Sequence, residues 1–143
     1  MNLYAAFKYE EQKRFDAFPF GFAFSKEQYE KMKEELGVKD DRELISIGAG
    51  GYIRKSDESA LDELVNDRHK RLAEAIAADE TGEGFIKDAF LYELANHEYC
   101  YTYDLDDTLE ALDLTIEQIQ SDKRLKHGLR LAIKEYTASA DSY

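Results

Sequence analysis

A cluster of three glycines within four residues constrains the fold of this 143-residue chain more than any other sequence feature. The cluster, Gly48-Ala49-Gly50-Gly51, joins the strand-like runs 44–47 and 52–54. Glycine adopts the positive φ angles that a tight hairpin turn requires. A glycine cluster can also cradle phosphate, but this one lacks a following Lys-Ser/Thr pair. The sequence therefore predicts an antiparallel hairpin near residues 44–54.

Two short segments are predicted to add strands to this hairpin. Phe20, Phe22 and Phe24 recur with the period of two that places side chains on one face of a strand, and we expect that face to be buried. Residues 99–103 are aromatic and β-branched apart from one cysteine, a composition that favours strands. A small antiparallel sheet is therefore predicted from the hairpin and short strands near 20–24 and 99–103.

Helical signals dominate the rest of the chain. Ser25 and Gln28 form a capping-box pattern and Gly37 is suited to a helix end, so a helix is predicted from about Lys26 to Leu36. Apolar spacings of three and four predict further helices over residues 2–15, 57–78, 85–97, from 104 to a break near 114, after a capping box at 115, and over 122–136. We expect a mostly helical α+β fold, with a single domain at 1–136 and a frayed polar tail at 137–143.

Negative charge is concentrated in one segment. The net charge is -12, and residues 79–122 contain 13 acids with Lys87 as their single cation. Such a segment repels anionic membranes, and it lacks the cations that bind nucleic-acid phosphates. No stretch approaches membrane-spanning length. We therefore expect neither membrane nor direct nucleic-acid binding, and a basic protein surface as the partner.

Cysteine content and the N-terminal residues bear on localisation. Cys100 is the single cysteine and excludes an internal disulfide. The first 15 residues contain a short apolar stretch followed at once by charges, rather than the apolar core of a signal peptide. A reducing, cytoplasmic location is expected.

One stretch carries an enzymatic signature. Residues 104–108 read Asp-Leu-Asp-Asp-Thr, which matches the DxDxT nucleophile motif of haloacid-dehalogenase-like phosphatases. That chemistry also requires a lysine and further acids on Mg²⁺, held by a parallel sheet, and 35 residues after Thr108 are too few to supply them. We expect Asp104 or Asp106 to start a helix instead. A phosphate-chemistry enzyme that uses Asp104 and Asp106 remains the alternative.

Metal-ligand patterns are incomplete. The stretch from Asp104 has Leu109 and Thr115 at the sixth and twelfth positions, where a calcium loop requires glycine and glutamate. His97 and Cys100 lie three residues apart, but no second cysteine completes a zinc set. We expect a buried thiol, a surface or strand-end histidine, and no metal site, cofactor or catalytic residue.

Acids of the late segment recur at helical spacing. Asp104, Asp107, Glu110, Asp113 and Glu117 are spaced three, three, three and four apart, so neighbouring acids share a helix face. Such a row is either solvated surface or a docking surface for cations, and it can imitate the dense phosphate charge of DNA. The predicted partner-binding residues are Glu80, Glu83, Asp104, Asp106, Asp107, Glu110, Asp113 and Glu117.

Three blocks of sequence carry a family resemblance. Residues 17–28 (AFPFGFAFSKEQ), 47–55 (IGAGGYIRK) and 81–115 resemble an uncharacterised family of small acidic proteins carried by phages and mobile elements of Gram-positive bacteria. The resemblance brings no catalytic residues. It implies inhibitors of host defence, of the anti-CRISPR or antirestriction type. Against a Cas9-type enzyme, acids could occupy the arginine-lined site that reads the PAM duplex.

These observations predict a non-catalytic acidic interaction protein. In this interpretation the chain mimics nucleic acid and binds a basic site on a host nucleic-acid enzyme. The alternative is a structural or regulatory accessory protein that forms a homo-oligomer through aromatic surface, with the acids serving solubility.

Overall fold

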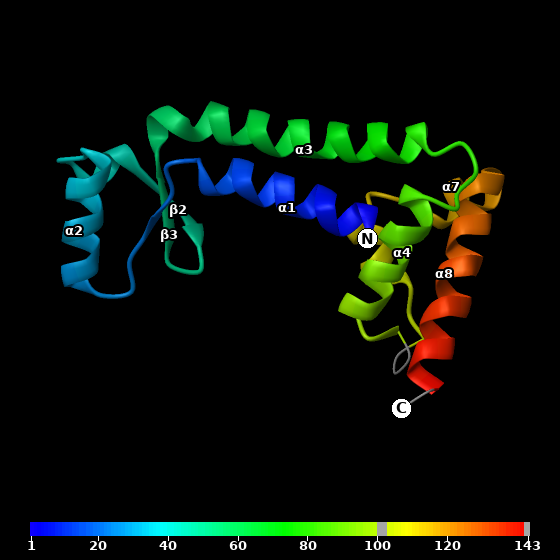
Figure 1. Cartoon of the computed structure of the whole chain (residues 1–143). Coiled ribbons are helices and arrows are strands. Elements are labelled where there is room, and N and C mark those ends of the chain that lie inside the picture. Colours follow the sequence, from blue (N-terminus) through cyan, green and yellow to red (C-terminus); the bar gives the residue numbers. More distant parts are fainter. Residues whose placement is uncertain (100–102, 142–143) are drawn as a thin grey trace. The chain divides into compact units, whose positions relative to one another are not determined.

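The computed structural model describes residues 1–99 and 103–141 and confirms a mostly helical α+β fold with a small antiparallel sheet (Figure 1). Short 3-10 turns at Asp41–Glu43 and Lys55–Asp57 flank the hairpin. The strands are β1 (Gly21–Phe22), β2 (Leu44–Gly48) and β3 (Gly51–Arg54). The described helices are α1 (Leu3–Asp16), α2 (Lys26–Leu36), α3 (Glu58–Ala78), α4 (Phe85–Asn96), α6 (Asp106–Ala111), α7 (Ile116–Ser121) and α8 (Lys123–Asp141).

Residue contacts group the chain into two compact units. Unit 1 comprises Met1–Glu11 and Arg68–Tyr143, and unit 2 comprises Gln12–Asp67. Helices α1 and α3 therefore contribute residues to both units. The single domain expected at 1–136 stays a prediction.

The sheet of unit 2 confirms the hairpin predicted at 44–54. Its strand order is β1-β3-β2, and both pairings are antiparallel. Gly48 pairs with Gly51, so Ala49 and Gly50 form a two-residue loop with φ angles of 52° and 76°. Positive φ at both loop positions is the geometry that matches the twist of a tight hairpin.

Strand β1 lies where a strand was predicted near 20–24, but the prediction that its phenylalanines are buried is wrong. Phe22 and Phe24 are 60% and 77% exposed, while Gly21 and Ala23 are buried. A Cβ on Gly21 would lie 2.5 Å from the sulfur of Met32, so α2 packs closely against that side of β1. The phenylalanines therefore point away from the core of unit 2.

The strand predicted near 99–103 falls on residues 100–102, which lie outside the described residues. On either side of them, the Tyr103 N–H donates to the Tyr99 carbonyl at 2.8 Å. Tyr103 has a φ of 54°.

Capping interactions confirm two helix starts. Ser25 Oγ accepts the Gln28 N–H at 3.2 Å, and α2 ends at Gly37 with a φ of 70°. The Gln28 side chain accepts the Phe24 N–H rather than completing the box on Ser25. At α7, Thr115 and Gln118 bond reciprocally. This second box confirms the predicted break near Leu114.

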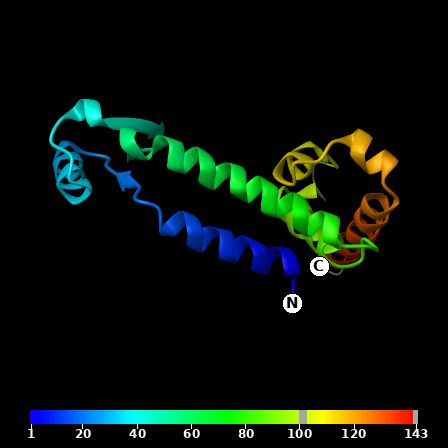
Figure 2. The same ribbon diagram turned by 90° about the horizontal axis from the view of Figure 1, so that it is seen from above.

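Unit 1 has an apolar core built on α4 and α8. These helices pack against each other, α7 packs on α8, and α6 contacts α4 (Figure 1 and Figure 2). Helix α8, predicted to end at Tyr136, continues to Asp141. Ile116, the first residue of α7, is 44% exposed. The buried core residues include Leu72, Ile76, Ile86, Phe90, Leu94, Leu109, Leu112, Ile119, Leu125, Leu129 and Ala132.

Among the glycines of unit 1, Gly82 makes the closest approach to neighbouring backbone, and it gives the first prediction. It has a φ of 86°, and a Cβ there would overlap the Arg124 carbonyl oxygen. We expect Gly82→Ala to lower the free energy of unfolding by more than about 2 kcal/mol, because backbone strain and a clash combine. Gly37→Ala is the matched control, since Gly37 also has positive φ but has open space around it.

For Gly37→Ala, positive φ alone should cost about 1 kcal/mol. Urea unfolding followed by circular dichroism measures both variants. Equal losses for the two substitutions would contradict the close approach of Gly82 to α8.

Candidate interaction surface

The loop between α3 and α4 is built around the carboxylate of Asp79. Its two oxygens accept the backbone N–H groups of Gly82 at 2.9 Å, Gly84 at 3.1 Å and Ile86 at 3.0 Å. The Thr81 N–H adds a bond of 3.2 Å. Desolvation raises the pKa of Asp79, but these bonds outweigh it and lower the pKa below its ordinary value. The loop is therefore fixed by an internal anion.

Arg124 holds the same loop from α8. Its Nη1 donates to the carbonyl oxygens of Ile76, Ala77 and Asp79 at 3.2, 3.3 and 2.6 Å. These carbonyls lie at the end of α3, where helical partners are missing. The remaining guanidinium nitrogens bind Asp122 and lower the pKa of that carboxyl. Arg124 thus stabilises the loop rather than neutralising the predicted partner-binding acids.

The loop presents Glu80 and Glu83 to solvent. Both are exposed, and Glu83 Oε1 lies 3.0 Å from His127 Nε2 on α8. A similar contact joins His69 Nδ1 on α3 to Asp113 Oδ2 in the turn between α6 and α7. Asp113 has a φ of 57°, in the left-handed region that aspartate tolerates better than most residues. His69 and His127 therefore each contact one of the predicted acids.

The start of α6 gathers three of the predicted acids. Asp104 Oδ1 accepts the Asp106 N–H at 2.8 Å, which is the helix-start role expected from sequence. Asp106 and Asp107 occupy the first turn, where the helix dipole favours negative charge. Glu110 lies four residues after Asp106 and three after Asp107, so these acids share one side of α6. Glu117 occupies the first turn of α7.

All eight predicted carboxylates are exposed, and they occupy three places in unit 1. These are the loop after α3, the first turns of α6, and the α6–α7 turn with the start of α7. Within the described part of the chain, seven of the eight make no ion pair with lysine or arginine. These seven, called the uncompensated acids below, are Glu80, Glu83, Asp106, Asp107, Glu110, Asp113 and Glu117.

Over residues 1–99 and 103–141, no group of three or more His, Cys, Asp or Glu side chains is arranged to hold a metal ion. Cys100, predicted to be a buried thiol, lies outside the described residues. His97 is half-buried at the end of α4, with its Nε2 at 3.1 Å from Glu93 Oε2.

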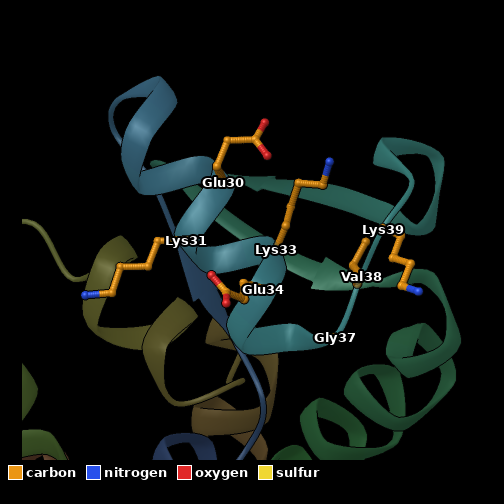
Figure 3. Close-up of a pocket in the computed structure, with 7 residues that line it drawn as sticks. All are labelled: Glu30, Lys31, Lys33, Glu34, Gly37, Val38 and Lys39. Atoms are coloured by element: carbon orange, nitrogen blue, oxygen red, sulfur yellow. The ribbon is translucent and has the colours of Figure 1, made fainter.

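A hollow of about 660 Å³ lies at the C-terminal end of α2 in unit 2. Ligand sites combine apolar walls with a few converging polar groups. Figure 3 shows the charged side chains of this hollow pointing in different directions. Its lining residues are Glu30, Lys31, Lys33, Glu34, Gly37, Val38 and Lys39. This arrangement does not define a ligand site.

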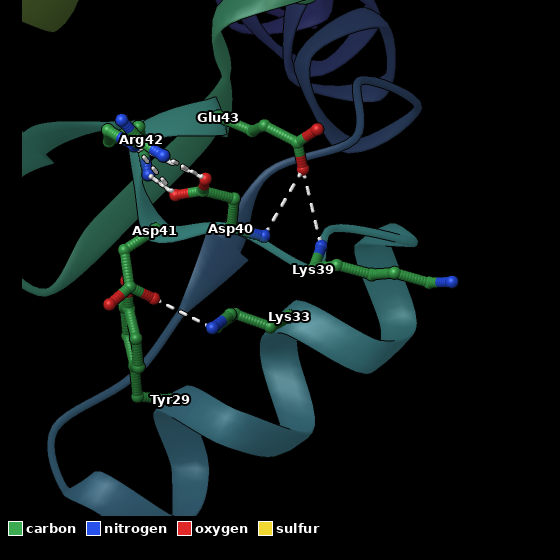
Figure 4. A network of polar contacts seen from close by, with 7 residues as sticks. All are labelled: Tyr29, Lys33, Lys39, Asp40, Asp41, Arg42 and Glu43. Atoms are coloured by element: carbon green, nitrogen blue, oxygen red, sulfur yellow. Dashed lines mark hydrogen bonds and ion pairs between the residues drawn. The ribbon is translucent and has the colours of Figure 1, made fainter.

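The polar groups beside this hollow stabilise the chain turn that follows α2 (Figure 4). Lys33 Nζ and the Tyr29 hydroxyl donate to Asp41 at 2.7 and 3.1 Å. The Lys33 hydrogen bond, followed by that of Tyr29, lowers the pKa of Asp41. Asp40 and Glu43 form a capping box at the next turn. These contacts explain the fold of residues 38–44.

Sequence reasoning missed a buried polar cluster around Glu93, which is 1% exposed. The Tyr4 hydroxyl donates to Oε1 at 2.7 Å, and Lys8 Nζ lies at 3.4 Å from the same oxygen. Asn96 and His97 contact Oε2 at 3.3 and 3.1 Å. Desolvation raises the pKa of Glu93, but the Tyr4 bond and the Lys8 charge outweigh it and lower the pKa. This carboxylate is therefore held ionised in the core.

A sequence signal for this cluster existed. Glu93 lies three residues after Phe90 and four after Ala89, so it falls on the apolar side of α4. A second buried acid, Glu11, is bound in two places by Arg71, at 2.6 and 2.8 Å. A charged residue within an apolar stripe marks a buried ion pair, and both partners here come from distant positions.

The fold and these sites define a class: a mostly helical α+β chain with a small antiparallel sheet and uncompensated acids on one of its two units. Residues 3–135 match the model of DUF7659, a family of unknown function, and the chain belongs to that family. This confirms the sequence resemblance to an uncharacterised family. Comparison with curated proteins and with solved structures found no match. None of the described helices combines the length and apolar character needed to cross a membrane.

The Asp79 loop gives a pH-dependent prediction. Because the pKa of Asp79 is lowered in the folded chain, its contribution to stability is complete above its ordinary value of 3.8. The contribution is lost as the pH falls below 3.8 and through the lower folded value. At pH 7, Asp79→Asn should lower the free energy of unfolding by about 1–3 kcal/mol. Urea unfolding of both proteins over a pH series should show this difference shrinking in acid, and a difference that grows in acid would be inconsistent with the lowered pKa.

The Glu93 cluster gives a third stability prediction. Tyr4→Phe removes one donor from a buried carboxylate, so we expect a loss of about 1–3 kcal/mol in the free energy of unfolding. Tyr92→Phe is the control, because the neighbouring Tyr92 packs against the Tyr4 ring but its hydroxyl has no hydrogen bond within the described residues. Thermal unfolding at neutral pH compares the two. Equal stability of both variants and the parent would show that the Tyr4 hydroxyl contributes nothing.

Proposed function

We propose that this chain is a non-catalytic interaction protein that binds a basic site on a partner through the acids of unit 1, and that it acts in the cytoplasm. One observation carries the proposal: seven exposed carboxylates in a segment of charge -12 make no ion pair with any lysine or arginine that the structure describes. The nearby arginine, Arg124, is committed to the α3–α4 loop. The negative field of unit 1 is therefore available to a partner.

Uncompensated charge of this kind favours fast and selective association. Complementary charge accelerates encounter and excludes partners of the wrong sign, and salt screens both effects. The acids lie on helix starts and on a hydrogen-bonded loop, so binding would require little ordering of the backbone. A solvated surface kept only for solubility would need neither selective association with cations nor acids on an ordered backbone.

A nucleic-acid enzyme is the partner class that we favour. Duplex DNA carries about one negative charge per 1.7 Å of its axis, and sites that hold it are rich in arginine and lysine. Carboxylates on fixed elements offer the same sign of charge to such a site. The phage and mobile-element context implied by the sequence resemblance supports an inhibitor that competes with DNA.

The position of Asp104 also supports a binding role. Its carboxylate accepts the Asp106 N–H and so takes part in starting α6. If the chain were a phosphatase of the DxDxT type, the same carboxylate would have to be the nucleophile. A helix-starting role gives the DxDxT-like stretch a structural purpose that requires no reaction.

Charge neutralisation tests the proposal. The partner would be captured at low salt from the host cell, purified, and titrated with this protein in competition with duplex DNA. The neutralised unit 1 variant combines Glu80→Gln, Asp107→Asn, Glu110→Gln and Glu117→Gln. We expect it to bind about tenfold more weakly at low salt, because four exposed charge contacts of a few tenths of a kcal/mol each together approach 1.4 kcal/mol.

A matched control removes the same charge from unit 2. It combines Glu27→Gln, Glu30→Gln, Glu34→Gln and Glu35→Gln on α2, where all four side chains are exposed. The control should bind as the parent does. If instead the neutralised unit 1 variant and the control both bound the partner as the parent does, docking through unit 1 would be wrong. A self-associating accessory role would then become the favoured alternative.

A further inference from the structure

Four phenylalanines and two polar residues surround a hollow of about 370 Å³ in unit 2. The residues come from the end of α1, the turn that follows it, and β1. The volume is near the lower end of the range for small-ligand pockets. We name these residues the phenylalanine cage: Gln12, Phe15, Asp16, Phe18, Phe20 and Phe22.

Backbone hydrogen bonds hold the chain segment that carries the rings of the cage. The Phe18 N–H donates to the Phe15 carbonyl at 3.0 Å, and the Phe20 N–H donates across Pro19 to the Phe18 carbonyl at 2.8 Å. Phe22 is fixed by its pairing with Gly51 in the sheet. The rings of Phe18 and Phe20 are 4.8 Å apart and tilted by 46°, and those of Phe20 and Phe22 are 6.4 Å apart and tilted by 41°. The cage is therefore formed before any ligand arrives.

One carboxylate lies at the cage. Gln12 Nε2 donates to Asp16 Oδ1 at 2.8 Å, which orients the carboxylate. Within the described part of the chain, Asp16 Oδ2 has no partner. The cage thus combines apolar aromatic walls with one free, oriented acceptor of negative charge.

This combination selects a cation. The faces of aromatic rings are electrostatically negative, and a cation over them gains more when an adjacent carboxylate is present. Phenyl rings carry no hydroxyl or N–H, so a neutral polar ligand gains little there. Elsewhere in this chain, lysines already lie over tyrosine rings, as Lys8 does over Tyr92 and Lys33 over Tyr29. No such cation lies over the cage rings among the described residues.

We propose that the phenylalanine cage binds an arginine side chain presented by a protein partner. A guanidinium is planar, weakly hydrated, able to stack on aromatic faces, and able to donate two hydrogen bonds to one carboxylate. The net charge of -12 favours a basic partner over a free anion or a neutral peptide. This inference goes beyond the proposed function, because the cage lies in unit 2 and uses none of the uncompensated acids.

Two matched probes test the proposal on the full-length protein. One probe is acetyl-arginine N-methylamide, and the other is acetyl-citrulline N-methylamide, which has nearly the same shape but no charge. Titrations followed by nuclear magnetic resonance should show shifts at the Gln12 side-chain amide and at the rings of Phe18 and Phe20. We expect the arginine probe to bind about 5- to 30-fold more tightly, which corresponds to about 1–2 kcal/mol.

Four variants locate the binding. Phe18→Leu keeps an apolar side chain but removes the aromatic face, and Asp16→Asn removes the charge while keeping an acceptor oxygen. Each should weaken arginine binding about fivefold. Phe24→Leu and Asp62→Asn are the controls, since both residues are exposed in unit 2 and lie outside the cage, and they should bind as the parent does. Should Phe18→Leu fail to fold, the exposed Asp16→Asn substitution still decides the question.

Three results would overturn the inference. Equal affinity for the arginine and citrulline probes would mean that the cage selects apolar surface rather than charge. Tighter binding of tetramethylammonium than of the arginine probe would assign the cage to a free quaternary ammonium ligand. A concentration-dependent dimer in light scattering, lost in Phe18→Leu, would assign it to a second copy of this chain.

Discussion

Hydrogen bonds of one carboxylate and one guanidinium with the backbone fix the loop between α3 and α4, from which unit 1 extends two of its acids into solvent. Asp79 binds the backbone N–H groups of its own loop, and Arg124 binds the carbonyls that end α3. The same loop touches α8 so closely that a Cβ on Gly128 would lie 2.6 Å from the Gly82 carbonyl oxygen. Because these two charged groups bind the backbone of the loop, Glu80 and Glu83 extend from a fixed backbone into solvent. The loop that carries Glu80 and Glu83 is thus held by charged groups that bind its backbone.

Unit 2 shows how close packing on one face exposes the other. Its buried cluster is small and consists of Ala23, Met32, Val38 and Leu44. Because Met32 lies against Gly21, the large side chains of the β1 segment must occupy the opposite face. The phenylalanines are thus exposed because Gly21 allows α2 to pack against the other face of the β1 segment. This packing also creates the phenylalanine cage.

Local features were predicted well from sequence, because the interactions that fix them span few residues. The Ser25 and Thr115 caps, the Gly37 helix end and the two-residue hairpin loop all depend on neighbours in the chain. Features that depend on distant residues were missed. Glu93 meets Tyr4 across 89 positions, and burial of the Phe22 face was predicted without knowledge of where α2 packs. The exposure of the eight predicted acids matches their polar character, whereas their distribution over three places depends on how α6 and α7 meet.

We propose that the uncompensated acids of unit 1 contact the partner. Hydrogen–deuterium exchange of the purified complex measures this contact directly, segment by segment. We predict slower exchange at residues 80–83 and 104–117 in the complex at low salt, with the protection lost at high salt because screening removes the attraction. Protection confined to residues 12–67, or protection at 80–83 and 104–117 that is insensitive to salt, would contradict the account.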